Sequence, residues 1–212
     1  LALSAANRRG IASMTIAMAF FVSNDAIVKF VSQSLPGAQL IFMRGVFASV
    51  FLLAVARHMG FINGPNGHLR QLLIRPVLLR AAFDAVATMV YLTALFHLPL
   101  GNATAINLAT PLFITLMAML TLGERVGAAR WLIISVGFAG VLLVVQPRAE
   151  GFNAWALLCV LGTFLHAVRD TLTRTIPASV PSVLITVSTA LAVTLLSGLL
   201  SVPQGWKPVR RH

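Results

Sequence analysis

Charged residues are scarce in this sequence. Only 10% of the 212 residues are charged, 58% are apolar, and the mean hydropathy is +0.90. Soluble domains carry about 25% charged residues, so a water-soluble fold of this length would lack the polar surface to cover itself. The scarcity excludes an ordinary soluble domain and indicates that lipid is the solvent for most of the chain.

Cysteine and the signatures of enzymes are also scarce. Cys159 is the single cysteine, so an intrachain disulfide is excluded, and its apolar surroundings predict a small packing residue. The sequence has no Gly-x-Ser-x-Gly, no His-Glu-x-x-His and no paired aspartates in facing spans. His97 and His166 do not have metal-ligand spacing. We therefore expect neither an intramembrane enzyme nor a metal or cofactor site.

Seven stretches are long and apolar enough to be transmembrane helices, because a bilayer core needs about 20 mostly apolar residues. Prolines and glycines separate several of them, as at Leu35-Pro36-Gly37 and Leu98-Pro99. The sequence predicts an all-α membrane protein with seven spans, namely 11–31, 38–56, 76–97, 100–122, 130–146, 154–173 and 182–202.

Basic residues give a net charge of +11, yet they punctuate the apolar runs instead of clustering on one face. That distribution excludes a nucleic-acid binder and is typical of membrane topology. With a cytoplasmic N-terminus, only Arg148 lies in an outside loop before the tail, although Lys207, Arg210 and Arg211 would also lie outside. The positive-inside rule then predicts a bacterial-type inner-membrane protein whose inside residues are Arg8, Arg9, Arg57, Arg70, Arg75, Arg125, Arg130 and Arg174.

An internal repeat emerges when the sequence is aligned with itself at a shift of 145 residues. Asp25 then falls on Asp170, Lys29 on Arg174, and Pro36 on Pro181. The first unit, 11–146, has an odd number of spans, so a second copy must enter the membrane from the opposite side. We expect an inverted repeat whose second unit, 154–212, is incomplete by three helices, or about 80 residues.

Residues 93–146 resemble the second half of an EamA-type repeat of the drug/metabolite transporter superfamily. The resemblance is strongest at Asn107-x-x-x-Pro111-Leu112-Phe113, Leu122-Gly123-Glu124-Arg125 and Gly137-Phe138-Ala139-Gly140-Val141. Asp25-x-x-x-Lys29 and Arg44 are similar to members of that family as well. The resemblance implies a ten-helix transporter built from two inverted five-helix repeats, with a central cavity, of which this chain would be a truncated form.

Ionisable side chains at membrane depth cost several kcal/mol unless they are paired or hydrated, so each one is a functional candidate. Lys29, Glu124 and Arg174 are expected to form structural pairs or gating contacts. The candidates for lining a substrate cavity are Asp25, Arg44, Asp84, Thr88, Tyr91, Thr104, Asn107, Pro111, His166 and Asp170.

Helical spacing predicts specific partners for some of these groups. Asp25 and Lys29 are one turn apart and can form a pair, which either lines the cavity or only neutralises itself near the outer interface, where Lys29 reaches toward water. Arg44 is expected to meet Asp25, and His166 to pair with Asp170. A cavity-facing Asp84 could bind a cationic substrate group or carry a proton.

The fourth span has a break of its own. Pro111 removes the backbone hydrogen bond to the carbonyl of Asn107 and should leave that acceptor free. Discontinuous helices of this kind build substrate sites in transporters, while the alternative is a kink for packing.

These patterns predict a secondary transporter that moves a small polar metabolite through the lipid bilayer by alternating access. The resemblance allows an amino acid, a riboflavin-like vitamin, S-adenosylmethionine or drug efflux. Protons as coupling ion would rest on Asp84 and His166. The alternatives are a non-transporting membrane subunit and an inactive transporter fragment, and the oligomeric state stays open.

Overall fold

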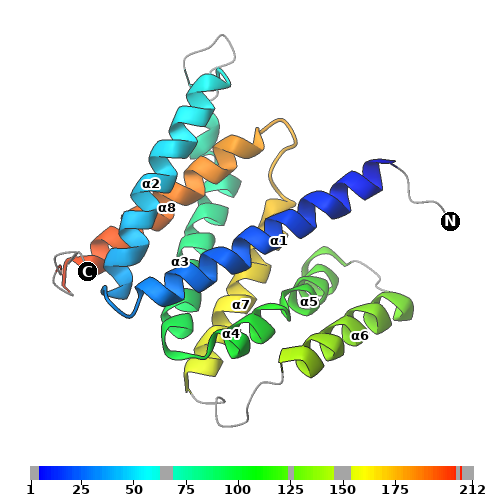
Figure 1. The fold of residues 1–212 in the computed structure, drawn as a ribbon. Coiled ribbons are helices and arrows are strands. Elements are labelled where there is room, and N and C mark those ends of the chain that lie inside the picture. Colours follow the sequence, from blue (N-terminus) through cyan, green and yellow to red (C-terminus); the bar gives the residue numbers. More distant parts are fainter. Residues whose placement is uncertain (1–4, 63–68, 124–126, 146–153, 204–205, 207–212) are drawn as a thin grey trace.

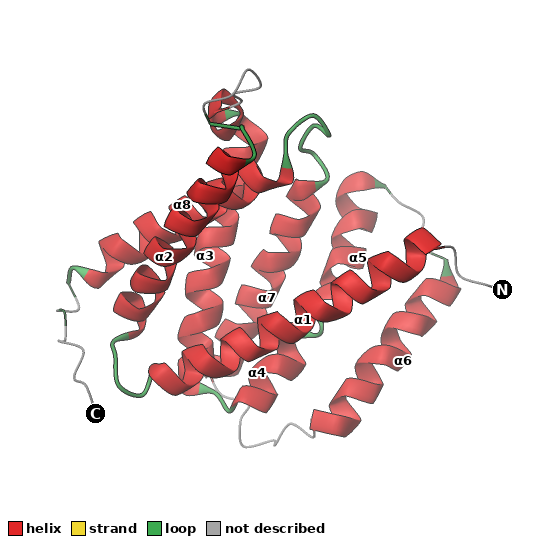
Figure 2. Cartoon of the chain, turned by 45° about the horizontal axis from the view of Figure 1, so that its top comes forward, coloured by secondary structure: helices red, strands yellow, loops and turns green. Residues whose placement is uncertain are grey.

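The computed structural model describes residues 5–62, 69–123, 127–145, 154–203 and 206, and this part of the chain is helical without any strand (Figures 1 and 2). The all-α prediction is confirmed. The elements in chain order are α1 (Ala5–Val31), α2 (Gly37–His58), the 3₁₀ helix η1 (Leu69–Leu73), α3 (Arg75–His97), α4 (Leu100–Asn107), α5 (Thr110–Leu122), α6 (Ala128–Val145), α7 (Ala154–Thr173) and α8 (Ser182–Ser201).

Proline marks the start of five helices. Pro36, Pro99 and Pro181 occupy the N-cap positions of α2, α4 and α8. Pro76 and Pro111 lie in the first turns of α3 and α5. A helix tolerates proline there because the first backbone N–H groups have no partner within the helix. The turn chemistry seen in the sequence therefore predicts most helix starts correctly.

Six helical segments of the described chain are long and apolar enough to cross a membrane, with α4 and α5 counted together as Leu100–Thr121. They agree with six of the seven predicted spans. The remaining one, 130–146, corresponds to α6, in which the described apolar stretch Trp131–Gly140 is shorter than a full span.

Helix α3 lies at the centre of the bundle. It packs along α7 and α8, and α2 packs along α8 (Figure 1). In the apolar stretch of α3, 44% of the residues are buried, against 11% of those in the apolar stretch of α1. Helix α1 crosses the other helices obliquely and packs against them only toward its C-terminal end. Polar side chains lie where α3 faces α7 and the C-terminal half of α1, and we call this region the polar interior; its members are Asp25, Asp84, Tyr91, His166, Arg169 and Asp170.

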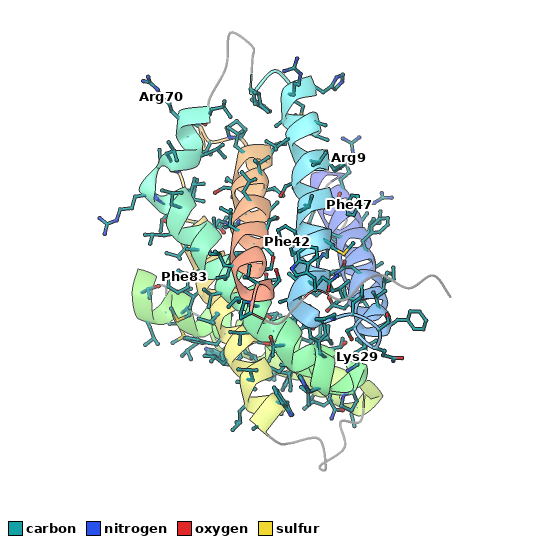
Figure 3. The ribbon with its side chains drawn as sticks, turned by 90° about the vertical axis from the view of Figure 1, so that its left-hand side faces the viewer. Arg9, Lys29, Phe42, Phe47, Arg70 and Phe83 are labelled. Atoms are coloured by element: carbon teal, nitrogen blue, oxygen red, sulfur yellow. The ribbon has the colours of Figure 1, made fainter. Side chains whose placement is uncertain are left out.

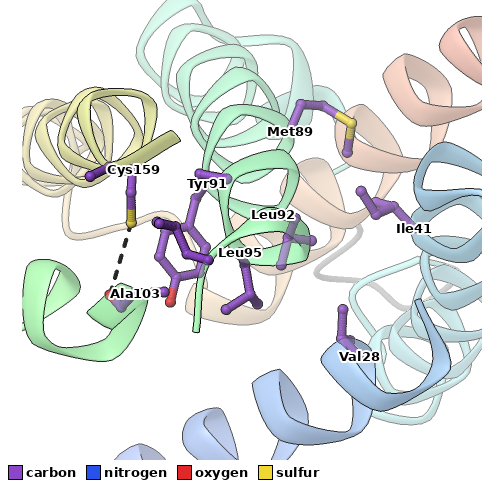
Figure 4. Close-up of a cluster of buried hydrophobic side chains, with 11 residues drawn as sticks. Val28, Ile41, Met89, Tyr91, Leu92, Leu95, Ala103 and Cys159 are labelled. Carbon is purple, nitrogen blue, oxygen red and sulfur yellow. Dashed lines mark hydrogen bonds between the residues drawn. The ribbon is translucent and has the colours of Figure 1, made fainter. Parts of the chain in front are cut away.

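The hydrophobic core gathers where α3 meets α7. Tyr91, Leu92 and Leu95 of α3 pack there with Cys159 of α7, whose thiol lies 3.9 Å from the carbonyl oxygen of Ala103 (Figure 4). Cys159 is fully buried and free, as its apolar surroundings in the sequence predict. This core fixes the depth at which the polar groups of the two helices face each other.

Large apolar side chains cover much of the outer surface. Phe20 of α1, Phe47 of α2 and Leu157 of α7 are more than 70% exposed, and Phe47 is labelled beside α2 in Figure 3. In water such a surface would aggregate, whereas in a bilayer it contacts lipid chains. The same view places Arg70 and Lys29 at opposite ends of the bundle.

Candidate functional site

Asp25 of α1 is buried against α3. It is only 4% exposed, and its carboxylate accepts a 2.9 Å hydrogen bond from the Tyr91 hydroxyl and a 3.4 Å bond from the Asn24 amide. The predicted contact between Arg44 of α2 and Asp25 is not formed: the charge of Arg44 acts on Asp25, but no ion pair within 4.0 Å joins these two described residues. Asp25 is thus held by two neutral donors and a more distant cation.

Lys29 does not form the predicted pair with Asp25. Its ammonium group donates instead to the carbonyl oxygens of Leu95, Phe96 and Leu98, at 2.7, 2.8 and 2.8 Å. The last carbonyls of a helix have no partner within it, and the negative end of the helix dipole attracts a cation. The three donors of an ammonium group match the end of α3 better than one carboxylate does. Lys29 therefore joins α1 to α3.

We expect Lys29→Met to destabilise the protein by about 1–3 kcal/mol, because three partly buried acceptors lose a charged donor. The control is Arg9→Met, which removes a cation from the exposed part of the same helix. Thermal unfolding in detergent would measure both. Equal effects of the two substitutions would contradict the anchoring role of Lys29.

A second polar cluster lies between α3 and α7, around Arg169. Its Nη1 is 3.0 Å from an Asp84 carboxylate oxygen, and its Nε is 2.9 Å from an Asp170 carboxylate oxygen. Asp84 is 5% exposed, while the Asp170 side chain is 37% exposed. A guanidinium offers several donors in a fixed plane and can serve two carboxylates at once. Arg169 thus joins acidic groups from two helices.

Arg80 extends this cluster to α8. It lies 3.8 Å from Asp84 and donates to the hydroxyls of Thr173 on α7, at 2.9 Å, and Thr189 on α8. One side chain near the start of α3 therefore contacts both neighbouring helices. These contacts hold the Arg80 side chain within the bundle.

Asp84 and Asp170 lie on packed helices, but they do not pair with each other. Arg169 stands between them and binds both. An acid/base dyad of two aspartates requires that they share a proton, which the guanidinium between them prevents. The arrangement is an ion-pair cluster and not an aspartic catalytic pair.

The predicted pair between His166 and Asp170 is not formed. The His166 ring lies 5.7 Å from the Tyr91 ring, tilted by 54°, and the charges that act on it are those of Arg169 and Asp84. Asp170 pairs with Arg169 instead, because the guanidinium next to it carries a positive charge and offers several donors to a carboxylate. His166 consequently links the Asp25–Tyr91 contact to the Arg169 cluster.

The fourth span is discontinuous, as its proline predicts. Helix α4 ends at Asn107 and α5 begins at Thr110. The predicted free acceptor is not found, because the Thr110 hydroxyl donates to the carbonyl oxygen of Asn107. Pro111 is exposed, Thr104 is half-buried, and the Thr115 hydroxyl donates to the Pro111 carbonyl at 2.7 Å. These residues stay candidates for lining a cavity.

The other predicted residues lie apart from these contacts. Thr88 is half-buried on α3, one turn from Asp84. Arg174 lies in the turn after α7 and is exposed. Glu124 lies outside the described residues. In the part of the chain that the structure describes, no group of histidine, cysteine and acidic residues could hold a metal ion.

Arg169 is the functional candidate that sequence reasoning missed. It directly precedes Asp170, but helical spacing predicted a pair between His166 and Asp170 and did not include Arg169. A signal was available, since Arg169 is an ionisable residue within an apolar span. Its long side chain reaches across from the neighbouring helical position, which a comparison by spacing alone overlooks.

Comparison with known proteins gives a family match. Residues 8–146 match the model of the EamA-like transporter family. The chain is 30% identical over 171 residues to a riboflavin transporter of Rhizobium johnstonii, which is 81% of this chain and 55% of that protein. No solved structure gives a significant match.

Two further relatives carry other names. Over 155 residues, 73% of this chain and 52% of the relative, it is 26% identical to a pseudopaline exporter of Pseudomonas aeruginosa. An S-adenosylmethionine uptake transporter of Rickettsia bellii is 27% identical over 165 residues, 78% of this chain and 55% of that protein. The chain spans about half the length of these curated relatives.

Proposed function

This chain belongs to the EamA-like transporter family, and from that premise we propose that its protein moves a small polar metabolite across the membrane by alternating access. The relatives are named for riboflavin, pseudopaline and S-adenosylmethionine, so the substrate class is a polar metabolite that carries ring systems or charged groups. The N-terminus is cytoplasmic in this proposal, as the distribution of basic residues favours.

The observation that carries the proposal is the polar interior between α1, α3 and α7. Three acidic residues, Asp25, Asp84 and Asp170, come together there with Tyr91 and His166 in a chain that has only five acidic residues. Bringing such groups to membrane depth is costly, and proteins retain them along substrate and ion pathways.

The inverted repeat gives the proposal its mechanism. Ser49 of α2 and Thr194 of α8 are 145 residues apart, the same interval as the repeat, and their hydroxyls lie 3.1 Å from each other. Equivalent positions of two inverted units meet only near the axis that relates them. Contact between these positions supports two units that rock against each other around a site at their interface.

Transport by proteoliposomes that hold the whole gene product tests the function. The panel contains labelled riboflavin, S-adenosylmethionine and amino acids, each with and without a proton gradient. We expect saturable accumulation of at least one of them above empty vesicles. A folded protein that accumulates none would favour a non-transporting membrane subunit or a substrate outside the panel.

A further inference from the structure

The three buried or half-buried carboxylates of the polar interior differ in whether a basic side chain lies within ion-pair distance. Asp84 has Arg169 at 3.0 Å and Arg80 at 3.8 Å, and Asp170 has Arg169 at 2.9 Å. Asp25 has no guanidinium or ammonium group within 4.0 Å among the described residues, and its hydrogen bonds come from Tyr91 and Asn24. One carboxylate of the three is therefore surrounded by neutral donors.

The internal repeat relates Asp25 to Asp170 and shows where their surroundings differ. At the interval of 145 residues, Asn24 and Asp25 of α1 correspond to Arg169 and Asp170 of α7. In both pairs the first side chain donates to the carboxylate that follows it, at 3.4 Å from the amide and 2.9 Å from the guanidinium. The local contact is the same in the two units, but only the second unit supplies a charge.

We propose that Asp25 is the carboxyl group that carries the coupling proton of this transporter, while Asp84 and Asp170 are held in ion pairs with Arg169. The assignment rests on the transport function proposed above. A carboxylate bound by a guanidinium keeps its charge, whereas one buried among neutral donors is neutralised far more easily by a proton. The proton-carrying role predicted for Asp84 and His166 thus passes to Asp25.

The groups that face Asp25 are compatible with both of its forms. Tyr91 on α3 can donate to the carboxylate and accept from the carboxylic acid, because a phenol does both. Lys29 on its own helix is occupied by the end of α3, and Arg44 on α2 acts through its charge from beyond ion-pair distance.

The other helices packed near Asp25 add little competing charge. Helix α4 contains no titratable residue. Helix α7 contributes the buried thiol of Cys159, and His166 lies behind the Tyr91 ring. The step itself is simple: the carboxylate takes a proton from water on one side, an O–H bond forms, and that proton returns to water on the other side when the bond breaks.

Infrared spectroscopy of the purified protein in lipid vesicles tests the assignment without any substrate. A protonated carboxyl group gives a C=O band that disappears when it ionises. We expect a band that disappears as the pH is raised in the unmodified protein and in Asp84→Asn, and its loss at every pH in Asp25→Asn. Asp25→Glu should keep the band at a shifted frequency, which also serves if Asp25→Asn does not fold.

Persistence of the band in Asp25→Asn, or an unshifted band in Asp25→Glu, would overturn the assignment. Tyr91→Phe gives an independent check, because loss of its hydrogen bond should displace the titration while the band remains. The spectra do not depend on transport, so a failure of the uptake assay with the titrating band present would count against the proposed function and leave the assignment of the band to Asp25 standing. A proton gradient that drives uptake equally in unmodified protein and Asp25→Asn would reject the assignment alone.

Discussion

Replacing Arg169 by methionine is expected to cause the largest loss of stability of any single substitution in the polar interior. The change removes the 3.0 Å contact to Asp84 and the 2.9 Å contact to Asp170 together. Asp84, 5% exposed, would keep only Arg80 at 3.8 Å. Removing one partner of a buried ion pair costs about 3–5 kcal/mol, and since the Arg169 side chain is 23% exposed we expect the lower end, about 3 kcal/mol.

A double-mutant cycle separates the stranded charge from the lost packing. Adding Asp84→Asn to Arg169→Met removes the charge that the first change leaves unpaired, so the double variant should be more stable than Arg169→Met alone. Arg75→Met is the control, because this arginine is exposed at the start of α3. Unfolding in detergent with increasing denaturant measures all four. Additive effects of Arg169→Met and Asp84→Asn would contradict the ion-pair cluster.

The second large effect is expected at Gly162, where α7 packs directly against the backbone of α3. A Cβ atom at Gly162 would lie 2.9 Å from both the Cα and the backbone nitrogen of Tyr91. Backbone atoms cannot move aside as a flexible side chain can, so Gly162→Ala must separate the two helices. Small residues allow such close approaches between membrane helices. We expect a loss of about 1–3 kcal/mol, the usual cost of overpacking.

Gly137 on α6 provides the matched control. A Cβ atom there would have no neighbour within 4 Å, so Gly137→Ala should be neutral or stabilising by up to about 1 kcal/mol, because alanine favours the helix. Thermal unfolding of both variants in the same detergent gives the comparison. Equal changes at the two positions would mean that the contact between α7 and Tyr91 is not close in the protein.

Gly162→Ala also bears on the site, because Tyr91 connects its two parts. The Tyr91 hydroxyl binds Asp25 and its ring lies against His166. A shift of α3 away from α7 would separate the Tyr91 ring from His166 on α7, while the hydrogen bond from Tyr91 to Asp25 on α1 would remain. The structural glycine therefore positions the polar interior as well as the core.

Several partners were not predictable from the sequence, and each for a physical reason. The expected pair of Asp25 and Lys29 obeys helical spacing, yet the carbonyls at the end of α3 offer Lys29 three acceptors that lie 66 to 69 residues away in the chain. The Asn107 carbonyl loses its backbone donor as expected, but the neighbouring Thr110 hydroxyl replaces it. In both cases the tertiary or local structure supplies a partner that helical spacing does not identify.

The sequence by itself determined that this is a helical membrane protein, where most helices begin, and to which transporter family it belongs. Those properties depend on composition, on hydropathy over about 20 residues, on proline positions and on short motifs such as Leu122-Gly123-Glu124-Arg125, all of which are local. Only the tertiary structure decided which charges meet. Arg169 reaches Asp84 across 85 residues of chain, and Tyr91 reaches Asp25 across 66. Such pairings depend on the depth of each helix in the bundle and on its rotation about its own axis. Packing between helices, at contacts such as Gly162, sets both quantities, and the sequence of a single helix does not encode them.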